Sequence, residues 1–424
     1  MKKITLLFVF ALLATLVFSQ DTLTVLQYNL LNYGAFSSYC TSTNNDPNLK
    51  DNYIKTIVQY VQPDIFTVNE ISSSTTYQSR ILNNTLNVNG INFYKKAVIS
   101  NTASSDIVNM LYYNSNKLGL SAHYVAQNDV RDIDIFKLYF KSDDLSSGDT
   151  IFIHCMTAHL KAGSSPSDET ERGIMASNAM AYYKKYFQPG NFMVMGDFNL
   201  YTSSEPAFLN FTNFFYQQYS FNDPINSPGD WNNNSSFKDI HTQSTHTGGE
   251  CFASGGMDDR FDFILASDHI INGTQSVKYI QGTYHAVGQD GQHYNRNLID
   301  LPANTTVPSD VLQALYNNSD HLPVTMKLLV DKSLDVPQQA AFDYLKVSNP
   351  AKDNLIISVS DQGIKHLNIR FSDLSGRIVY QTAIASVDGR FDFSIPVEQY
   401  AAGIYILMLN SDSEKMAAKK IVVQ

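Results

Sequence analysis

The chain has few cysteines, a single tryptophan and only one long apolar run. Three cysteines in 424 residues exclude a disulfide-rich scaffold, and their positions do not have the spacing of a zinc site. Cys155 lies in an apolar stretch and is expected to be a small buried residue. Cys40 and Cys251 lie in polar segments, so a single disulfide between them is left open.

The one long apolar run is at the start of the chain. It extends from Ile4 to Phe18, after two lysines and before Ser19. This pattern predicts a secretory signal peptide, residues 1–19, with cleavage after Ser19. A membrane anchor is the alternative, but the run is short for a bilayer and no cluster of charged residues follows it. We therefore expect a secreted or cell-surface protein without a transmembrane segment in its mature form.

Basic residues are also in deficit. Residues 20–340 contain 19 Lys and Arg against 31 Asp and Glu, whereas residues 341–424 contain nine of each. A net-acidic domain lacks the positive field of a tight nucleic-acid binder. A hydrolase that uses a divalent cation to approach phosphate is still compatible with this charge.

The composition, with 43% hydrophobic and 17% charged residues, is that of a globular protein, and the length predicts more than one domain. We place a catalytic domain at residues 20–330, a linker at 331–340 and a second domain at 341–424. In the first, strands are expected at 22–29, 65–70, 92–98, 107–113, 121–126, 133–141, 150–160, 192–196, 260–265 and 324–330. Helices are expected at 49–61, 75–86 and 167–187, with another starting near 203–206, and the stretches 221–256 and 270–318 are expected to be irregular. The pattern indicates an α/β fold with two sheets and helices outside them.

Polar residues occur at or beside the ends of these strands, where such folds collect active sites. Asp197 and Asn199 follow the most apolar strand and, in extended backbone, would project from the same face. An Asx turn that merely closes the strand is the alternative interpretation of this pair. The other residues of this kind are Asn29, Glu70, His159, Asp262, Asp320 and His321.

The order and spacing of these motifs resemble the endonuclease/exonuclease/phosphatase superfamily, which includes deoxyribonuclease I, abasic-site endonucleases, bacterial sphingomyelinases and inositol-polyphosphate phosphatases. The segments Gly-Asp-Phe-Asn at 196–199 and Ser-Asp-His at 319–321 are the most specific matches. The resemblance covers about residues 21–329 and implies a two-layered β-sandwich flanked by helices.

The resemblance also implies roles for single residues. Metal ligation, with Mg²⁺ preferred and Mn²⁺ or Ca²⁺ as alternatives, is implied for Glu70, Asn29 and Asp320. Catalytic roles are implied for His159, Asp197, Asn199, Asp262 and His321. The resemblance further implies that Asp262 orients His321. It also implies that Asn29 and Asn199 bind substrate phosphate.

Other positions are less certain matches to the superfamily. Leu31 replaces a polar residue usual there, and Asn69 replaces a common Gln. Asp106 is the nearest candidate for an acidic partner of His159. Arg172 is expected to pair with Asp168 or Glu169 one helical turn away, rather than to reach substrate.

Residues 341–424 contain short alternating strands and turns, which predict a small all-β sandwich. Asn-Pro-Ala-Lys-Asp at 349–353, Asp-Leu-Ser-Gly-Arg at 373–377 and Ala-Gly-Ile-Tyr at 402–405 resemble the sorting domain of proteins exported by the type IX secretion system. That resemblance implies recognition by the type IX machinery, and a generic adhesion module is the alternative.

Together these observations predict a secreted, Mg²⁺-dependent phosphoric ester hydrolase, an endonuclease acting on extracellular DNA or RNA. A sphingomyelinase-type phospholipase C or a small-molecule phosphatase is the second hypothesis. The loops contain no clear apolar tip of the kind that inserts into a membrane, with only Trp231 in a polar loop. A surface binding protein with a decayed site is the third hypothesis.

Overall fold

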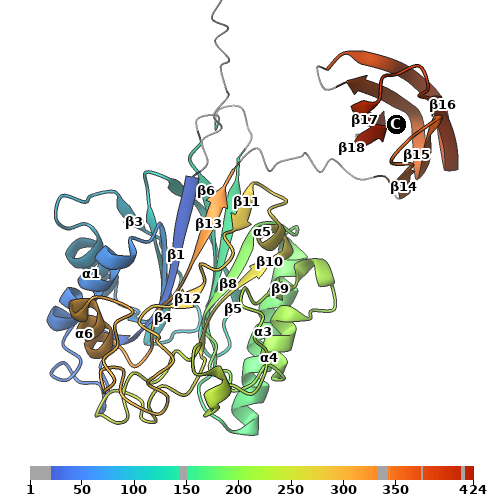
Figure 1. Cartoon of the computed structure of the whole chain (residues 1–424). Helices are drawn as coiled ribbons and strands as arrows, with labels where there is room; N and C mark the ends of the chain where they lie inside the picture. Colours follow the sequence, from blue (N-terminus) through green and yellow to red (C-terminus); the bar gives the residue numbers. More distant parts are fainter. Residues whose placement is uncertain are drawn as a thin grey trace, which may run out of the picture. The chain divides into compact units, whose positions relative to one another are not determined.

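The computed structural model describes residues 21–142, 145, 150–331, 342, 344–373, 376–411 and 416–424. The expected signal peptide and nearly all of the expected linker lie outside these residues. The chain divides into two compact units, Met1–Leu334 and Asp335–Gln424. Figure 1 colours the chain along the sequence and labels its helices and strands.

The first unit contains two β-sheets. One has the strand order β11-β13-β1-β2-β4-β3, with β12 also paired to β13. Its strands are β1 (Asp21–Tyr33), β2 (Ile65–Ser72), β3 (Tyr94–Lys96), β4 (Ile107–Asn114), β11 (Val277–Tyr279), β12 (His285–Ala286) and β13 (Val324–Val330). The other has the order β5-β6-β7-β8-β10-β9. Its strands are β5 (Leu118–Gln127), β6 (Ile133–Phe140), β7 (Phe152–His159), β8 (Phe192–Asp197), β9 (Phe221–Asn222) and β10 (Asp262–Ser267).

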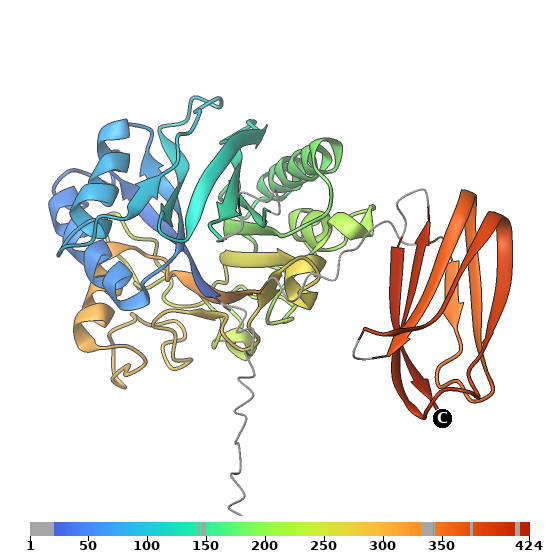
Figure 2. The same cartoon turned by 90° about the horizontal axis from the view of Figure 1, so that it is seen from above.

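Helices cover the outer faces of both sheets, as the view from above shows (Figure 2). The first sheet is covered by α1 (Pro47–Val61), α2 (Thr75–Arg80), which continues into a π-helical turn at Ile81–Leu86, and α6 (Ser309–Asn318). The second is covered by α3 (Pro166–Tyr186) and α4 (Pro206–Thr212). The short helix α5 (Asp268–Asn272) follows β10. This arrangement confirms the expected α/β class and the β-sandwich flanked by helices.

Strand β8 shows why the two sheets pack together. Successive side chains of a strand point to opposite faces, so a strand that is apolar at every position is buried on both sides. Met193 and Met195 pack into the core between the sheets, whereas Phe192 and Val194 face α3. Phe192 stacks on Tyr183 of that helix, with ring centroids 4.1 Å apart.

Helix ends follow the local sequence. Ser165 caps α3 through a reciprocal pair of hydrogen bonds with Asp168, and Pro166 occupies the first turn. The helix therefore begins slightly before the Ser167 start that the sequence suggested. Asp46 caps α1 with a single hydrogen bond, which its side chain accepts from the Asn48 backbone nitrogen.

The expectation that residues 270–318 are irregular was wrong. They contain β11, β12 and the helix α6, whose buried face packs on α1 and includes Val311, Leu312 and Leu315. The apolar spacing of a helix is present in this stretch, but the surrounding polar residues hide it at the level of composition. The stretch 221–256 is mostly loop, with only β9 and a short 3₁₀ turn, Ser235–Phe237.

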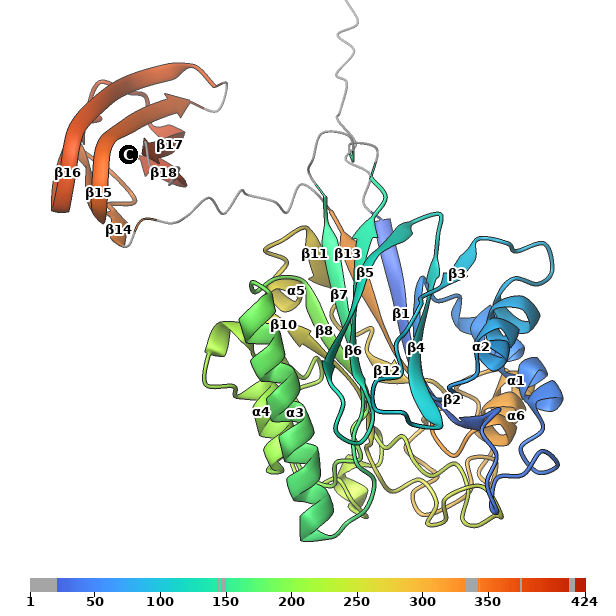
Figure 3. The same ribbon diagram turned by 180° about the vertical axis from the view of Figure 1, so that it is seen from behind.

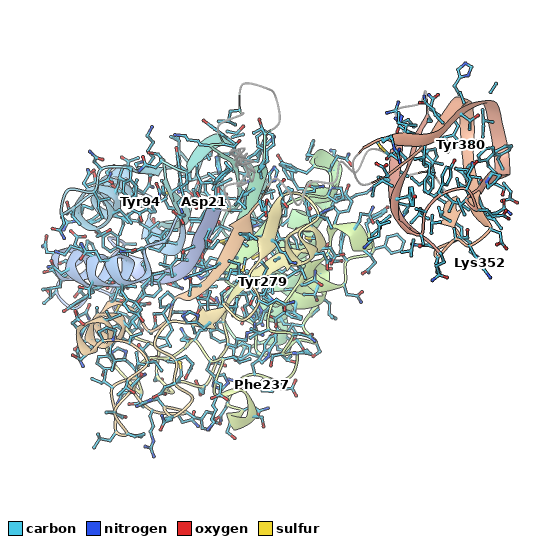
Figure 4. The ribbon with its side chains drawn as sticks, turned by 45° about the horizontal axis from the view of Figure 1, so that its top comes forward. Asp21, Tyr94, Phe237, Tyr279, Lys352 and Tyr380 are labelled. Carbon is cyan, nitrogen blue, oxygen red and sulfur yellow. A yellow bond between two sulfur atoms is a disulfide. The ribbon has the colours of Figure 1, made fainter. Side chains whose placement is uncertain are left out.

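These loops gather at one end of the sandwich. Phe237, in one of them, lies at the opposite end of the domain from Asp21 at the start of β1 (Figure 4). None of the described helices is both long and apolar enough to cross a membrane.

The second unit is all-β, as expected. It contains β14 (Tyr344–Val347), β15 (Asn354–Asp373), β16 (Ile378–Pro396), β17 (Gly403–Ser411) and β18 (Met416–Val423). Strand β16 follows β15 along nearly its whole length, while β14 pairs with the first part of β15 and β17 with its last part. A register shift between Asp361 and Ile364 lies between these two parts, and such an irregularity bends the paired strands.

Candidate active site

Five polar residues from both sheets meet at one centre: Asn29, Glu70, His159, Asp197 and Asp262. Figure 3 shows the two sheets side by side, with loops gathered at one end of them. Parallel strands bring their carboxyl ends to the same edge, and β1 is parallel to β2 as β7 is to β8. His159 is in register with Asp197, and Asn29 with Asn69, the neighbour of Glu70. Strand β10 is antiparallel to β8, so Asp262 at its start lies beside Asp197 at the end of β8.

Asn29 connects the carboxylates of Glu70 and Asp197. Its side-chain nitrogen donates to Glu70 Oε1 at 3.1 Å and to Asp197 Oδ2 at 2.9 Å, while its oxygen accepts from the Leu31 backbone nitrogen at 2.9 Å. Asn29 thus offers the centre a donor and not the oxygen of a metal ligand. The other oxygen of Glu70 accepts from the Asn32 backbone nitrogen at 2.9 Å.

The backbone at this point is in an unusual conformation. Leu31, Asn32, Glu70 and Asn199 all have φ between 47° and 56°. Residues other than glycine rarely adopt this region, and such strained positions cluster at functional sites. The bonds from Asn29 and Asn32 of β1 to the Glu70 carboxylate help to hold Glu70 in this conformation.

His159 lies between the two carboxylates. Its Nε2 is 3.7 Å from Glu70 Oε1 and 3.6 Å from Asp197 Oδ2, and ligand atoms of all three residues lie within 4.8 Å of one another. Burial, with contributions from Arg131 and His321, lowers the pKa of His159 well below its ordinary value. A neutral imidazole beside two carboxylates can accept a proton or bind a cation.

His321 forms a dyad with Asp262. Its Nδ1 donates to Asp262 Oδ2 at 2.7 Å, and its Nε2 faces Asp197 Oδ2 at 3.7 Å. Burial lowers the pKa of His321, but the carboxylates of Asp262, Asp197 and Asp320 outweigh it and raise the pKa well above the ordinary value. The surroundings of the two histidines therefore shift their pKa values in opposite directions.

Asp197 is held by its neighbours in the chain and across the sheet. Its Oδ1 accepts from the Asn199 backbone nitrogen at 3.0 Å, which is the Asx turn suggested by the sequence, and its backbone nitrogen donates to Asn69. The Asx turn and the site thus coexist. A Cβ at Gly196, where φ is +149°, would lie 1.7 Å from the Ala158 carbonyl oxygen, so only glycine fits there.

Burial raises the pKa of Asp197 to about 7. Nearby carboxylates of Asp262 and Glu70 act in the same direction, whereas His321 opposes them. The carboxylates of Asp197 and Glu70 lie within 4.8 Å of one another. Two carboxylates at such a separation are stabilised by a cation or by sharing a proton.

Asp320 is oriented by residues from a different loop. Its Oδ2 accepts from the Ala253 backbone nitrogen at 2.9 Å and from Gln243 Nε2 at 3.3 Å, while its Oδ1 is buried without a protein partner. Gln243 Nε2 also lies 2.7 Å from His321 Nε2. No pattern in the sequence marked Gln243. Its position depends on backbone hydrogen bonds that join residues 242–245 to residues 256–259 on one side and to Asp320 on the other.

A disulfide joins Cys40 to Cys251 across a separation of 211 residues. It connects the loop after β1 to the loop that contains Ala253. Cys155 is free and buried, as expected.

Two side chains that the sequence did not indicate also support the site. Lys50 is 2% exposed and donates to the carbonyl oxygens of Leu30 and Leu31, directly after Asn29. Arg131 donates to the carbonyl oxygen of Leu160 at 3.1 Å, beside His159. A buried lysine and a loop arginine become recognisable as site residues only when these long-range contacts are known.

Some expected partners are different in the structure. Asp106 is exposed at the start of β4, and the carboxylates near His159 are Glu70 and Asp197 instead. The prediction for Arg172 was wrong. Its side chain is 1% exposed and pairs with Glu205 at 2.7 Å, because it turns inward between α3 and α4 rather than along the surface of α3.

The loop histidines and Trp231 have structural surroundings. Trp231 is fully buried. His246 stacks between Phe252 and Tyr316, with ring centroids 3.8 and 3.9 Å apart. His154 on β7 stacks on Phe192, with ring centroids 4.0 Å apart. It lies on the opposite face of the strand from His159, because the two positions are an odd number of residues apart.

Solved structures similar to this chain include three with related shapes. Humanized D. rerio TDP2 has 12% identity over 72% of this chain and 98% of that chain, with a TM-score of 0.43. The human Nocturnin catalytic domain has 13% identity over 73% and 97%, with a TM-score of 0.41. An endonuclease/exonuclease/phosphatase from Beutenbergia cavernae has 11% identity over 95% and 99%, with a TM-score of 0.39.

No protein of curated function matches the sequence. Residues 348–424 match the family described as secretion system C-terminal sorting domain. The sorting domain expected from the motifs at 349–353, 373–377 and 402–405 is thereby confirmed. This match spans most of the C-terminal unit.

Proposed function

We propose that the first unit is a divalent-metal-dependent phosphodiesterase that hydrolyses DNA or RNA outside the cell. The observation that supports this most directly is the meeting of Glu70, His159 and Asp197 with the His321–Asp262 dyad in one buried centre. Phosphodiester hydrolysis needs an oriented oxygen nucleophile, neutralisation of developing charge and a group that exchanges a proton near neutral pH. The centre contains side chains suited to each requirement.

The donor set fits a cation such as Mg²⁺. Glu70 is the ligand indicated both by the resemblance and by the geometry, and its side chain is 15% exposed, so water can complete the coordination of a bound ion. Asp197 and His159 are within reach of the same ion, and Asp320 has one buried oxygen without a protein partner. When bound, the ion would neutralise negative charge on the phosphate. Asn29 would then act by orienting Glu70 and Asp197.

The remaining steps are assigned to side chains of the chain itself. Asp262 accepts a hydrogen bond from the Nδ1–H of His321. This bond fixes the imidazole ring so that Nε2 faces the centre. From there, protonated Nε2 can donate to a phosphate oxygen or to the leaving oxygen. Asp197, whose Oδ2 lies 3.6 Å from His159, is placed to hold the attacking water and receive its proton. Asn199, whose side-chain nitrogen donates to the Leu160 carbonyl oxygen at 3.4 Å, has a second N–H that can serve a phosphate oxygen.

Nothing observed at Trp231 favours the phospholipase hypothesis, because this tryptophan is fully buried and 5.3 Å from the Arg260 guanidinium. The decayed-site hypothesis is disfavoured because, apart from the polar residue that Leu31 replaces, every polar residue expected at the centre is present. The sorting domain supports export by the type IX machinery, to the cell surface or beyond it. The substrate is therefore proposed to be nucleic acid met outside the cell.

A substrate panel with the purified chain tests the proposal. Single-stranded DNA, plasmid DNA, RNA, sphingomyelin and inositol phosphates would be incubated with Mg²⁺, Mn²⁺ or Ca²⁺, and with chelator. We expect cleavage of nucleic acid that stops with chelator, and a loss of about 10²–10⁴-fold in kcat for Glu70→Gln and His321→Ala.

His154→Gln is the matched control, because His154 is on the same strand as His159 but outside the centre. It should retain activity. Hydrolysis that persists in Glu70→Gln and His321→Ala, or nucleic acid left uncut while a lipid or inositol phosphate is cleaved, would overturn the proposal.

A further inference from the structure

A groove of about 320 Å³ lies beside the Glu70 centre. Three separate segments line it: the loop after β1, the start of β4 and the turn between β5 and β6. Its principal side chains are Asn32, Phe36, Ser37, Ser105, Asp106 and Arg131. Because the end of β2 pairs with the start of β4, with Ser72 opposite Ile107, the groove is adjacent to the end of the strand that contains Glu70.

Two residues that line the groove also contact the residues of the centre or their neighbours. Asn32, in its wall, donates its backbone N–H to Glu70 Oε2 at 2.9 Å. Arg131, also in its wall, donates to the carbonyl oxygen of Leu160, the residue after His159, at 3.1 Å. A substrate with a phosphate at Glu70 and His159 would therefore extend its next group into this groove.

Both walls are fixed before any ligand binds. Asp132 is 6% exposed, and its carboxylate accepts from the backbone nitrogens of Thr102 and Ala103 at 2.7 and 2.8 Å, which holds the loop before β4. On the other side, the Ser37 backbone nitrogen donates to the Cys40 carbonyl oxygen at 2.8 Å, and Cys40 is joined to Cys251. Binding to such a preformed groove loses little conformational entropy.

The chemistry of the walls is that of a site for a flat, polar-edged ring. Phe36 is 46% exposed, and its ring is supported by Tyr77, edge to face, at a centroid distance of 6.2 Å. Asp106 and Ser105, from another of the segments that line the groove, offer hydrogen-bonding groups, and Arg131 adds a guanidinium to the lining. Aromatic stacking with polar contacts at the ring edge is how proteins bind unpaired bases.

We propose that this groove binds one unpaired nucleobase of a single-stranded nucleic acid, adjacent to the phosphate that is cleaved. Phe36 is the stacking platform, and Asp106 accepts hydrogen bonds from amino or imino groups of the base. The proposal rests on the proposed phosphodiesterase function and narrows its substrate to strands with an accessible base. A duplex substrate would have to unpair a base to enter.

A matched pair of substrates tests the groove: a single-stranded oligonucleotide, and an oligomer of the same length with tetrahydrofuran abasic units. Both have the same backbone charge, and only one has bases. We expect wild-type protein to show a lower KM for the oligonucleotide. Phe36→Ala should raise that KM by about 5- to 150-fold, toward the abasic value, with little change for the abasic oligomer. Phe36→Trp should restore the lower KM.

Phe215→Ala is the control variant, because Phe215 is 85% exposed and is not among the residues that line the groove. Equal KM values for the two substrates, or a Phe36→Ala variant that behaves like Phe215→Ala, would overturn the inference while hydrolysis itself continued. Fluorescence anisotropy with labelled oligonucleotide and abasic oligomer, in the presence of chelator, provides a readout that does not depend on turnover. If no substrate is hydrolysed, the phosphodiesterase proposal fails, and this binding difference still decides the groove.

Discussion

Reduction of the Cys40–Cys251 bond is expected to destabilise the first unit and to weaken binding of oligonucleotide. The bond closes a loop with a sequence separation of 211 residues. It also anchors the wall of the groove that contains Phe36, and it fixes the loop whose Ala253 donates to Asp320. Cys155 is a free thiol, so the Cys40–Cys251 bond is the one disulfide that a reductant can break.

The magnitude follows from the length of the closed loop. In the chain-entropy treatment a loop of this length corresponds to about 5 kcal/mol at 25 °C. An unfolding entropy of about 2.1 cal/mol/K per residue, summed over residues 21–331, is about 0.65 kcal/mol/K. Dividing the two gives a decrease in Tm of about 8 °C on reduction.

Differential scanning calorimetry of oxidised protein, reduced protein and the Cys40→Ser/Cys251→Ser variant provides the measurement. Reduced and variant protein should show the same lower Tm, and reductant should not change the variant further. The KM for single-stranded oligonucleotide should rise in both. A Tm that stays within about 2 °C of the oxidised value, with an unchanged KM, would refute the reasoning, because then the bond would restrain neither the unfolded chain nor the groove.

Two further predictions concern stability alone. Burial and the nearby Lys137 lower the pKa of His154 to about 4, so the unfolded chain binds the extra proton between pH 6.5 and 4 and stability falls as pH decreases through that window. In urea titrations, the free energy of unfolding of wild-type protein should fall by about 3 kcal/mol more over this pH window than that of His154→Gln. An equal pH dependence of the two proteins would contradict the assignment. Arg172→Met should cost about 3–5 kcal/mol, because it leaves the Glu205 carboxylate buried and unpaired, whereas Arg172→Met combined with Glu205→Leu should lose less. A double variant as unstable as the sum of the two single changes would show that the pair is not coupled.

Local sequence determined much of the fold. The apolar run 192–195 in β8 and the alternating residues in β1 are sufficient to predict strands, and the capping residues before α1 and α3 mark where helices begin. The same patterns place Asn29, Glu70, His159 and Asp197 at strand ends. The helix α6 was missed because a single amphipathic stretch in a polar segment gives a weak local signal, and its packing on α1 stabilises it.

Long-range contacts were decided only by the tertiary structure. The sequence could not give the partners of His159, Arg172 and Gln243, since each depends on how strands and loops distant in sequence are paired. The same applies to the groove beside Glu70, which is assembled from three loops. Local propensity acts over a few residues, whereas register and sheet packing are set by burial of the whole core. The sequence by itself therefore determined which chemical groups stand at the ends of the strands, and the packing of the two sheets decided which of those groups face one another.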